Sequence, residues 1–350
     1  MKLFRGNRKT ACGLDLGHRW AKLVRLKPAR KKAALDRMAR MPWRRDDWDQ
    51  KDQAASKIKS LWKNTELQNK TVITSLAGHA VIIKRMDLPA SETKNLEETI
   101  YKQAKQYIPF DVNDVYLDFQ ILGPGREAES KNVVLVASKQ KMVQDLQDIF
   151  QKSDLGIQVV DVDGFALSNC FEFNYPEMVP ESSYILDIGG GHSIFCVYSQ
   201  NKPLFIRDIG FGGDQLTERI SETLQMNTAE AEKTKLSRLK SLESQTKKKV
   251  QSELENILIS WADEIQRLIN LYQNSQQDDA PAAKRLYLAG GGSLTAGLAD
   301  ILSEELDLEV SYLNPWRNVS CDEYAFDTSY LQSAGPQFAV AVGLALRTVQ

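Results

Sequence analysis

The sequence of 350 residues has few cysteines and histidines and no long apolar run, which are the features that mark zinc-binding and membrane-spanning proteins. It contains three histidines and four cysteines, and the cysteines form no CxxC pair. We therefore expect no zinc centre, because such sites use clustered Cys and His ligands. No run of residues approaches the ~18 apolar positions that a membrane-spanning helix needs. The isolated cysteines are expected to be small buried hydrophobic residues: Cys12, Cys170, Cys196 and Cys321.

Net charge is almost absent as well. Lys+Arg number 45 and Asp+Glu number 46, which leaves a formal net charge of −1. No bulk field attracts nucleic acid or anionic lipid, so we expect no nucleic-acid partner. The basic start, residues 1–10, is followed by no apolar core and does not resemble a secretory signal. These observations predict a cytoplasmic protein, long enough for two domains.

Three glycine turns, each after an apolar strand pattern, carry the chemistry of the sequence. They are Asp15–Lys22 (DLGHRWAK), Asp187–Ser193 (DIGGGHS) and Ala289–Leu294 (AGGGSL). Glycines let backbone N–H groups surround phosphate oxygens, and an Asp at a strand end can hold Mg²⁺ through water. The third turn is expected to open a helix, Leu294–Leu306, whose first N–H groups favour an anion.

Any one of these turns alone is more simply an ordinary hairpin turn. Three of them in this order favour a nucleotide site instead. The sequence has no GxxxxGK[ST] loop and no GxGxxG after a strand, which disfavours the P-loop and Rossmann classes.

The second half of the chain repeats the pattern of the first. YILDIGGGHSIFCVYS follows the order of ACGLDLGHRWAKLVRL: apolar strand, Asp-x-Gly, turn, apolar strand. Between them, residues 81–122 read as a separate module with strands VIIKRMDLP and VYLDFQIL. Its helix is expected from about Ser91, the N-cap, to Tyr107, before Pro109. Other predicted helices are Ala54–Trp62, Lys139–Ser153, Phe165–Glu172, Asp214–Leu224, Thr228–Leu239, Lys249–Gln273 and Phe338–Arg347.

Over nearly its whole length the chain resembles the PilM family of type IV pilus assembly, which is related to the division protein FtsA. The resemblance rests on DLGHRWAKLVRL, the IPF end of the inserted helix, RDIGFGGDQLTE, AGGGSL and FAVAVGLALR. It implies an α/β, actin-like two-lobed fold with duplicated five-stranded-sheet subdomains and an inserted small α+β module. The implied boundaries are 1–80 and 159–180 for the first lobe, 81–158 for the module, 181–330 for the second lobe, and 331–350 for a C-terminal helix packing on the first lobe.

The resemblance also implies ATP and Mg²⁺ in the cleft between the lobes. Asp15 and Asp187 would face the metal through water, and Lys22 would reach the β/γ-phosphates. Glu232 and Lys235 would face the adenine and ribose; without the family, the simpler interpretation of that pair is a solvated i,i+3 ion pair. The remaining nucleotide-binding residues implied are Gly17, Gly189, Gly190, Gly191, Ser193, Gly290, Gly291, Gly292 and Ser293.

Two departures from the family pattern bear on activity. His18, Arg19 and Trp20 stand where the family usually has small residues, so they would crowd the phosphates, contact one through Arg19, or turn outward. Asp163 stands where related ATPases orient the attacking water, and it is a workable base. Gly164 replaces the usual proline there, so Asp163 is either catalytic or an exposed loop carboxylate, and ATP hydrolysis is expected to be weak or absent.

The inserted module is where the family binds its partner, the cytoplasmic N-terminal peptide of the membrane protein PilN. The implied function is a cytoplasmic scaffold at the inner face of the inner membrane, linking the alignment complex to pilus motor or platform proteins, as in twitching motility. The alternatives are a phosphotransferase or ATPase of the same superfamily and a filament-forming FtsA-like protein. The IPF segment would instead fill the core of the module if it does not face a groove. Candidate groove residues are Leu88, Pro89, Tyr107, Ile108, Pro109 and Phe110.

Overall fold

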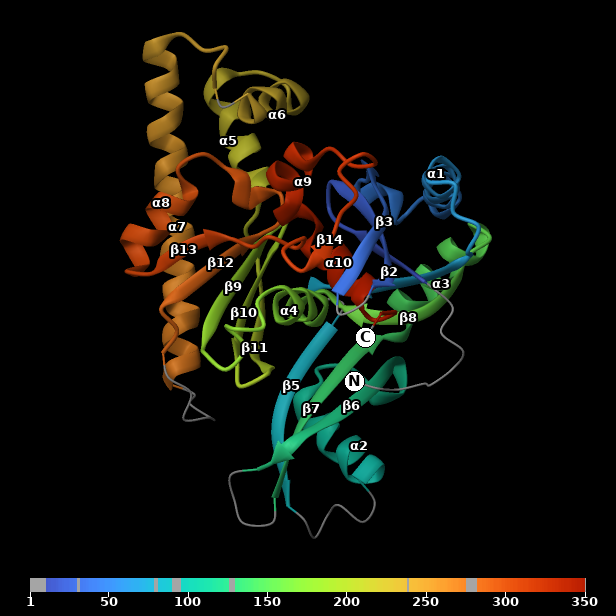
Figure 1. Ribbon diagram of the computed structural model, residues 1–350. Helices are drawn as coiled ribbons and strands as arrows, with labels where there is room; N and C mark the ends of the chain where they lie inside the picture. The colour runs from blue at the N-terminus through green and yellow to red at the C-terminus, as the bar shows by residue number, and fades with distance from the viewer. Residues whose placement is uncertain are drawn as a thin grey trace.

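The computed structural model describes residues 11–29, 32–78, 81–89, 96–125, 130–237, 239–274 and 282–349. Two α/β lobes lie side by side, and a smaller sheet extends below them (Figure 1). The three sheets have six, five and three strands. The predicted two-lobed α/β architecture with a small inserted module is therefore confirmed, with one strand more in the first lobe than expected.

The first lobe is built on the six-stranded sheet, in the order β14-β3-β2-β1-β4-β8. Its extra strand, β14 (Val319–Ser320), returns from late in the chain and pairs in parallel with β3. Helices α1 (Lys51–Asn64) and α3 (Gln140–Lys152) contribute to the same core as Trp43, which is fully buried. The other strands are β1 (Cys12–Leu16), β2 (Trp20–Ala29), β3 (Lys32–Pro42), β4 (Thr71–Leu76) and β8 (Gly156–Val162), and a 3-10 turn, η1, spans Arg45–Asp47.

The second lobe repeats this plan with a five-stranded sheet, in the order β11-β10-β9-β12-β13. The long helix α7 (Ser244–Asn274) runs along one side of this sheet in Figure 1, and it buries the apolar face that its sequence predicts. The strands are β9 (Ser183–Ile188), β10 (Ser193–Ser199), β11 (Lys202–Ile209), β12 (Arg285–Ala289) and β13 (Glu309–Tyr312). The other helical elements are α5 (Gly213–Leu224), α6 (Thr228–Leu236), η5 (Gly292–Leu294) and α8 (Leu298–Leu306).

Two helices pack between the lobes and share one core with both sheets. They are α4 (Asp163–Asn174) and α10 (Ala339–Leu346). A Cβ on Gly343 would lie 1.7 Å from the Ala166 carbonyl oxygen, so the two backbones touch where the helices cross. The C-terminal helix α10 also packs on β1 and β2 of the first lobe. It is preceded by α9 (Thr328–Ala334) and η6 (Gly335–Phe338).

The small module is a three-stranded antiparallel sheet, in the order β5-β7-β6, with one helix on it. Its elements are β5 (Val81–Pro89), α2 (Leu96–Tyr107), η4 (Val112–Asp114), β6 (Val115–Pro124) and β7 (Ser130–Lys139). The expected module, 81–158, also takes in α3 and β8. Both of these join the first lobe instead, α3 through the core under α1 and β8 through pairing with β4. The expected N-cap Ser91 lies outside the described residues.

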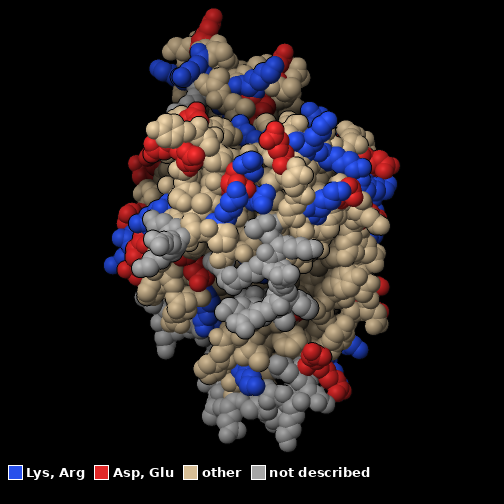
Figure 2. Space-filling model, turned by 45° about the vertical axis from the view of Figure 1, so that its right-hand side comes forward, with Lys and Arg blue, Asp and Glu red and all other residues tan. Residues whose placement is uncertain are grey.

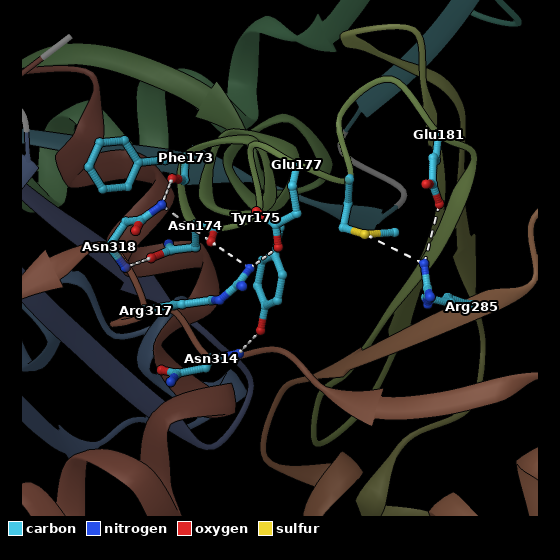
Figure 3. A network of polar contacts seen from close by, with 10 residues as sticks. Phe173, Asn174, Tyr175, Glu177, Glu181, Arg285, Asn314, Arg317 and Asn318 are labelled. Carbon is cyan, nitrogen blue, oxygen red and sulfur yellow. Dashed lines mark hydrogen bonds and ion pairs between the residues drawn. The ribbon is translucent and has the colours of Figure 1, made fainter.

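A polar network fastens the end of α4 to the segment that precedes β14 (Figure 3). Arg317 donates to the Asn174 carbonyl at 3.3 Å, pairs with Glu177, and lies 4.7 Å from the Tyr175 ring centroid. The Tyr175 hydroxyl in turn accepts from the Asn314 backbone at 2.8 Å. The end of α4 is therefore held to the segment before β14 by several polar contacts.

The surface carries both signs of charge, in keeping with the near-zero net charge. In Figure 2, Lys and Arg side chains gather on the upper part of the face shown, with Asp and Glu side chains among them. Over the part of the chain that the structure describes, no helix combines the length and apolar character that crossing a membrane requires.

Candidate nucleotide site

A cavity of about 910 Å³ lies between the two lobes and is reached by all three glycine turns. This volume is in the range of pockets that hold small-molecule ligands. All but three of the predicted nucleotide-binding residues line it. The predicted residues that line the cavity are Asp15, Gly17, Lys22, Asp187, Gly189, Gly190, Glu232, Lys235, Gly290, Gly291 and Gly292.

The first turn joins β1 to β2 as a tight hairpin. The backbone N–H of Gly17 donates to the Trp20 carbonyl at 3.2 Å. Asp15 and Lys22 face each other across the hairpin and form an ion pair at 2.5 Å, with the carboxylate almost fully buried. Burial alone would lower the pKa of the Lys22 ammonium, but the Asp15 carboxylate raises it above its ordinary value. Lys22 therefore stays charged at the floor of the cavity.

The second turn joins β9 to β10 with the same backbone pattern. The N–H of Gly189 donates to the His192 carbonyl at 3.0 Å. Asp187 occupies the place that Asp15 has in the first turn, but Ile194 stands opposite it instead of a lysine. Burial raises the pKa of Asp187 to about 6, an effect that Lys22 opposes and Asp15 reinforces. Among the described residues, no group donates a hydrogen bond to this carboxylate.

The third turn follows β12 and packs directly against the second. Gly290 has a φ of +82°, and a Cβ there would lie 2.2 Å from the Asp187 carboxylate, so only glycine fits. The expectation that this turn opens a helix at Leu294 is wrong. Residues 292–294 form a single 3-10 turn, and α8 begins only at Leu298, because Gly297 adopts a left-handed φ of +83°.

Asp163 is not on an exposed loop. It is the first residue of α4, and it lines the cavity with Asp15 and Asp187. Burial and the Asp15 carboxylate raise its pKa well above the usual range, although a hydrogen bond with Ser75 opposes them. Gly164 is required behind it, since a Cβ there would lie 2.6 Å from Ile206 Cγ2.

Glu232 and Lys235 are not a freely solvated pair. They form an ion pair at 2.8 Å on α6, and Lys235 also donates to the Gly213 carbonyl at 2.8 Å and to Thr217 at 2.6 Å. These bonds fasten α6 to the start of α5 at one wall of the cavity. The i,i+3 ion pair is therefore present, but it is partly buried and bonded to α5 rather than fully solvated.

Beside this pair the cavity is lined by residues of α6, α7 and α8 and of the segment after α6. Sequence reasoning missed this part of the lining, which we call the apolar slot. Its apolar residues read in the sequence only as faces of amphipathic helices. The lining residues are Leu236, Leu239, Leu254, Leu258 and Ile301, with Glu255, Asp300 and Glu304.

Three predicted nucleotide-binding residues lie away from the cavity lining. The Ser193 hydroxyl is buried and donates to the Phe211 carbonyl at 2.8 Å, and the buried Ser293 hydroxyl donates to the Gly290 carbonyl at 2.7 Å. Both hydroxyls therefore stabilise the backbone of their turns through hydrogen bonds to carbonyl oxygens. Gly191 is covered by the His18 ring, which a Cβ on this glycine would approach to 2.7 Å.

His18 and Arg19 do not turn outward. The His18 Nε2 atom lies 3.1 Å from one oxygen of the Asp214 carboxylate, and Arg19 Nε donates to the other at 2.7 Å. Asp214 is the second residue of α5 in the second lobe, so these bonds cross the cleft. Sequence reasoning missed Asp214, although it stands in the family-specific segment RDIGFGGDQLTE.

The candidate partner residues on the module divide between core and surface. Leu88 is fully buried and Ile108 is 5% exposed, so both belong to the module's core and neither forms an open groove wall. Pro89, Tyr107 and Pro109 are exposed. Phe110 is half-buried, with Lys139 Nζ 4.0 Å from its ring centroid. The IPF segment thus partly fills the core and partly faces solvent.

Two lobes on related sheets, with three glycine turns around the cavity between them, define an actin-like protein. Solved structures share this fold: the ethanolamine utilization protein EutJ from Carboxydothermus hydrogenoformans is 13% identical, with a TM-score of 0.57 over 98% of this chain and 91% of that one. MreB5 of Spiroplasma citri bound to AMPPNP is 10% identical, with a TM-score of 0.55 over 97% and 96%. The structure described as the PilM-PilN type IV pilus biogenesis complex is 29% identical, with a TM-score of 0.87 over 98% of this chain and 100% of that one.

The profile of the family described as "Type IV pilus assembly protein PilM" matches residues 13–349. The chain belongs to this family.

Proposed function

We propose that this chain binds ATP with Mg²⁺ in the cleft and serves as a nucleotide-dependent scaffold of type IV pilus assembly. The observation that carries the proposal is the meeting of three glycine turns, Lys22 and the strand-end acids at one cavity. The backbone N–H groups of the turns and the Lys22 ammonium suit the phosphates. The apolar slot beside Glu232 and Lys235 suits the nucleoside.

The donor set at the strand ends fits Mg²⁺, which takes oxygen ligands and keeps several waters. Asp187 is the better candidate, because among the described residues nothing donates to it, whereas Asp15 is already paired with Lys22. When bound, Mg²⁺ would neutralise phosphate charge beside these carboxylates. Asp163 is the candidate base for an attacking water, but its raised pKa favours the protonated form, which supports slow or absent hydrolysis.

The test of the cleft is a titration of fluorescent ATP with Mg²⁺ into wild type and Asp187→Ala. We expect the substitution to weaken binding at least tenfold, because it removes the free strand-end carboxylate. Asp263→Ala, on the exposed side of α7, is the matched control and should bind as wild type does. Equal affinity of Asp187→Ala and wild type would show that the nucleotide site is elsewhere. Steady hydrolysis at ~1 s⁻¹ or faster would instead favour an ATPase or phosphotransferase.

We further propose that the small module receives the cytoplasmic N-terminal peptide of PilN, which would place the chain at the inner face of the inner membrane. This is supported by the match to the PilM-PilN complex and by the solvent-facing Pro89, Tyr107 and Pro109 beside Phe110. The two outer strands β5 and β6 also leave edges to which an extended peptide can add.

Calorimetry with a synthetic N-terminal PilN peptide tests this. We expect a Kd in the micromolar range for wild type and a roughly tenfold loss for Tyr107→Ala. Tyr101→Ala is the matched control, since Tyr101 is also an exposed tyrosine of α2, 47% exposed against 40% for Tyr107. No heat at high concentration, or equal losses for both variants, would contradict the assigned surface.

A further inference from the structure

The first turn is joined across the cleft to the start of α5 by a clasp of three side chains: His18, Arg19 and Asp214. Both oxygens of the Asp214 carboxylate are used, one by His18 at 3.1 Å and one by Arg19 at 2.7 Å. Burial alone would raise the pKa of Asp214, but the hydrogen bonds from His18 and Arg19 lower it, so the carboxylate is ionised. The clasp is thus an anion held by two cationic or hydrogen-bonding groups at the cavity wall.

The backbone of the second turn holds Asp214 in this place. The Gly213 N–H donates to the Gly189 carbonyl at 3.0 Å, and the Asp214 N–H donates to the Gly190 carbonyl at 2.8 Å. The start of α5 is therefore tied to the turn that is expected to cradle phosphate, and its carboxylate lies at that turn.

The clasp also covers the second turn. A Cβ on Gly190 would lie 2.7 Å from Arg19 Cγ, and a Cβ on Gly191 would lie 2.7 Å from His18 Cε1. The glycines that leave their backbone open to an anion are the ones on which the two side chains rest. A phosphate approaching Gly190 and Gly191 must displace them.

Arg19 is only partly used in the clasp. Its Nε donates to Asp214, whereas among the described residues its two terminal nitrogens have no hydrogen-bond partner. The side chain is 38% exposed and lines the cavity. A guanidinium with free donors in a fixed fork is well suited to phosphate.

We propose that Asp214 and a nucleotide phosphate compete for Arg19, and that phosphate binding opens the clasp and takes Arg19 as a ligand. This rests on the proposed ATP site. Because only open molecules can bind, the apparent Kd equals the intrinsic Kd divided by the open fraction. The clasp therefore weakens nucleotide binding, and it links the distance between the lobes to nucleotide occupancy.

The test is the Kd of ATP, pyrophosphate and adenosine for wild type, Asp214→Asn and Arg19→Ala. Asp214→Asn weakens the clasp and leaves Arg19 free, so ATP and pyrophosphate should bind roughly three- to tenfold more tightly, the gain of about one charged contact. Adenosine has no phosphate, and its affinity should not change. Arg19→Ala should bind ATP more weakly than Asp214→Asn. Glu218→Gln, exposed on the same helix, is the control and should match wild type.

The outcomes separate the clasp from the ATP site. If ATP binds wild type and Asp214→Asn equally, or binds the variant less tightly, the clasp proposal is overturned while the site stands. If neither protein binds ATP at millimolar concentration, the proposed site fails. A double-mutant cycle of unfolding free energies for Arg19→Ala and Asp214→Ala then decides about the clasp itself, and zero coupling would overturn it.

Discussion

The first and second glycine turns share one backbone hydrogen-bond pattern, but they differ in their side chains: the first carries bulky residues where the second has glycines. In each, the glycine two residues after the Asp donates to the carbonyl three residues further on, at 3.2 Å and 3.0 Å. His18 and Arg19 of the first turn correspond in position to Gly190 and Gly191 of the second. Across the cleft, the Arg19 side chain lies against Gly190 and the His18 ring lies against Gly191.

The acids of the two turns differ in the same way. Asp15 is held by Lys22 at 2.5 Å, whereas Asp187 faces Ile194 and has no such partner within the described part of the chain. The comparison teaches that a duplicated turn need not have a duplicated role. In the proposed site the first turn would supply charged side chains, and the second would supply glycine backbone and the Asp187 carboxylate. Three experiments, ordered by expected effect, test this division.

The largest effect is expected from Asp15→Asn, which removes the partner of a nearly buried ammonium. Breaking a buried pair from one side costs about 3–5 kcal/mol, because the other charge stays buried without compensation. Urea unfolding in EDTA without nucleotide should show a loss of about 3 kcal/mol. A variant as stable as wild type would show that the Asp15–Lys22 pair does not support the first turn.

Asp187→Asn should change the free energy of unfolding in the opposite direction to Asp15→Asn. A carboxyl whose folded pKa is raised, here to about 6, contributes stability below its unfolded pKa and loses it as pH rises through the folded value. Wild type should therefore weaken relative to the variant between about pH 4 and pH 7, by at most ~3 kcal/mol at about 1.4 kcal/mol per pKa unit. Unfolding measured along this pH range in EDTA provides the check. A constant difference between the two proteins would contradict the raised pKa.

Alanine at the matching glycines should distinguish the tightness of the two hairpins. A Cβ on Gly189 would lie 2.7 Å from the His192 carbonyl oxygen, and one on Gly17 would lie 3.1 Å from that of Trp20. The backbone must move further to fit an alanine at Gly189 than at Gly17. We therefore expect the free energy of unfolding to fall by about 2 kcal/mol in Gly189→Ala and by about 1 kcal/mol in Gly17→Ala. Denaturant midpoints of the two variants measure this, and a reversed order would show that the turns differ in backbone after all.

Much of this architecture could be predicted from the sequence, because the Asp-x-Gly strand patterns and the repeat are local. The turns around Gly17 and Gly189 and the helix face of α7 follow from such patterns. β14 and α9 were missed, since a two-residue strand and a seven-residue helix have too little periodicity.

The clasp could not have been predicted in the same way. Arg19 and Asp214 are 195 residues apart, and only the approach of the two lobes brings them together. The apolar slot is similar: Leu236 and Ile301 come from different helices, and each alone looks like an ordinary amphipathic position. Local pattern thus predicts the turns, and tertiary packing decides what the side chains on them meet.

The most direct test of the central claim is a crystal structure with Mg²⁺ and a non-hydrolysable ATP analogue. We predict the phosphates between the first and second turns, the base in the slot lined by Leu236 and Ile301, and Arg19 turned from Asp214 to a phosphate oxygen. A nucleotide bound outside the cleft, or bound within it while the Arg19–Asp214 bond remains intact, would contradict the account.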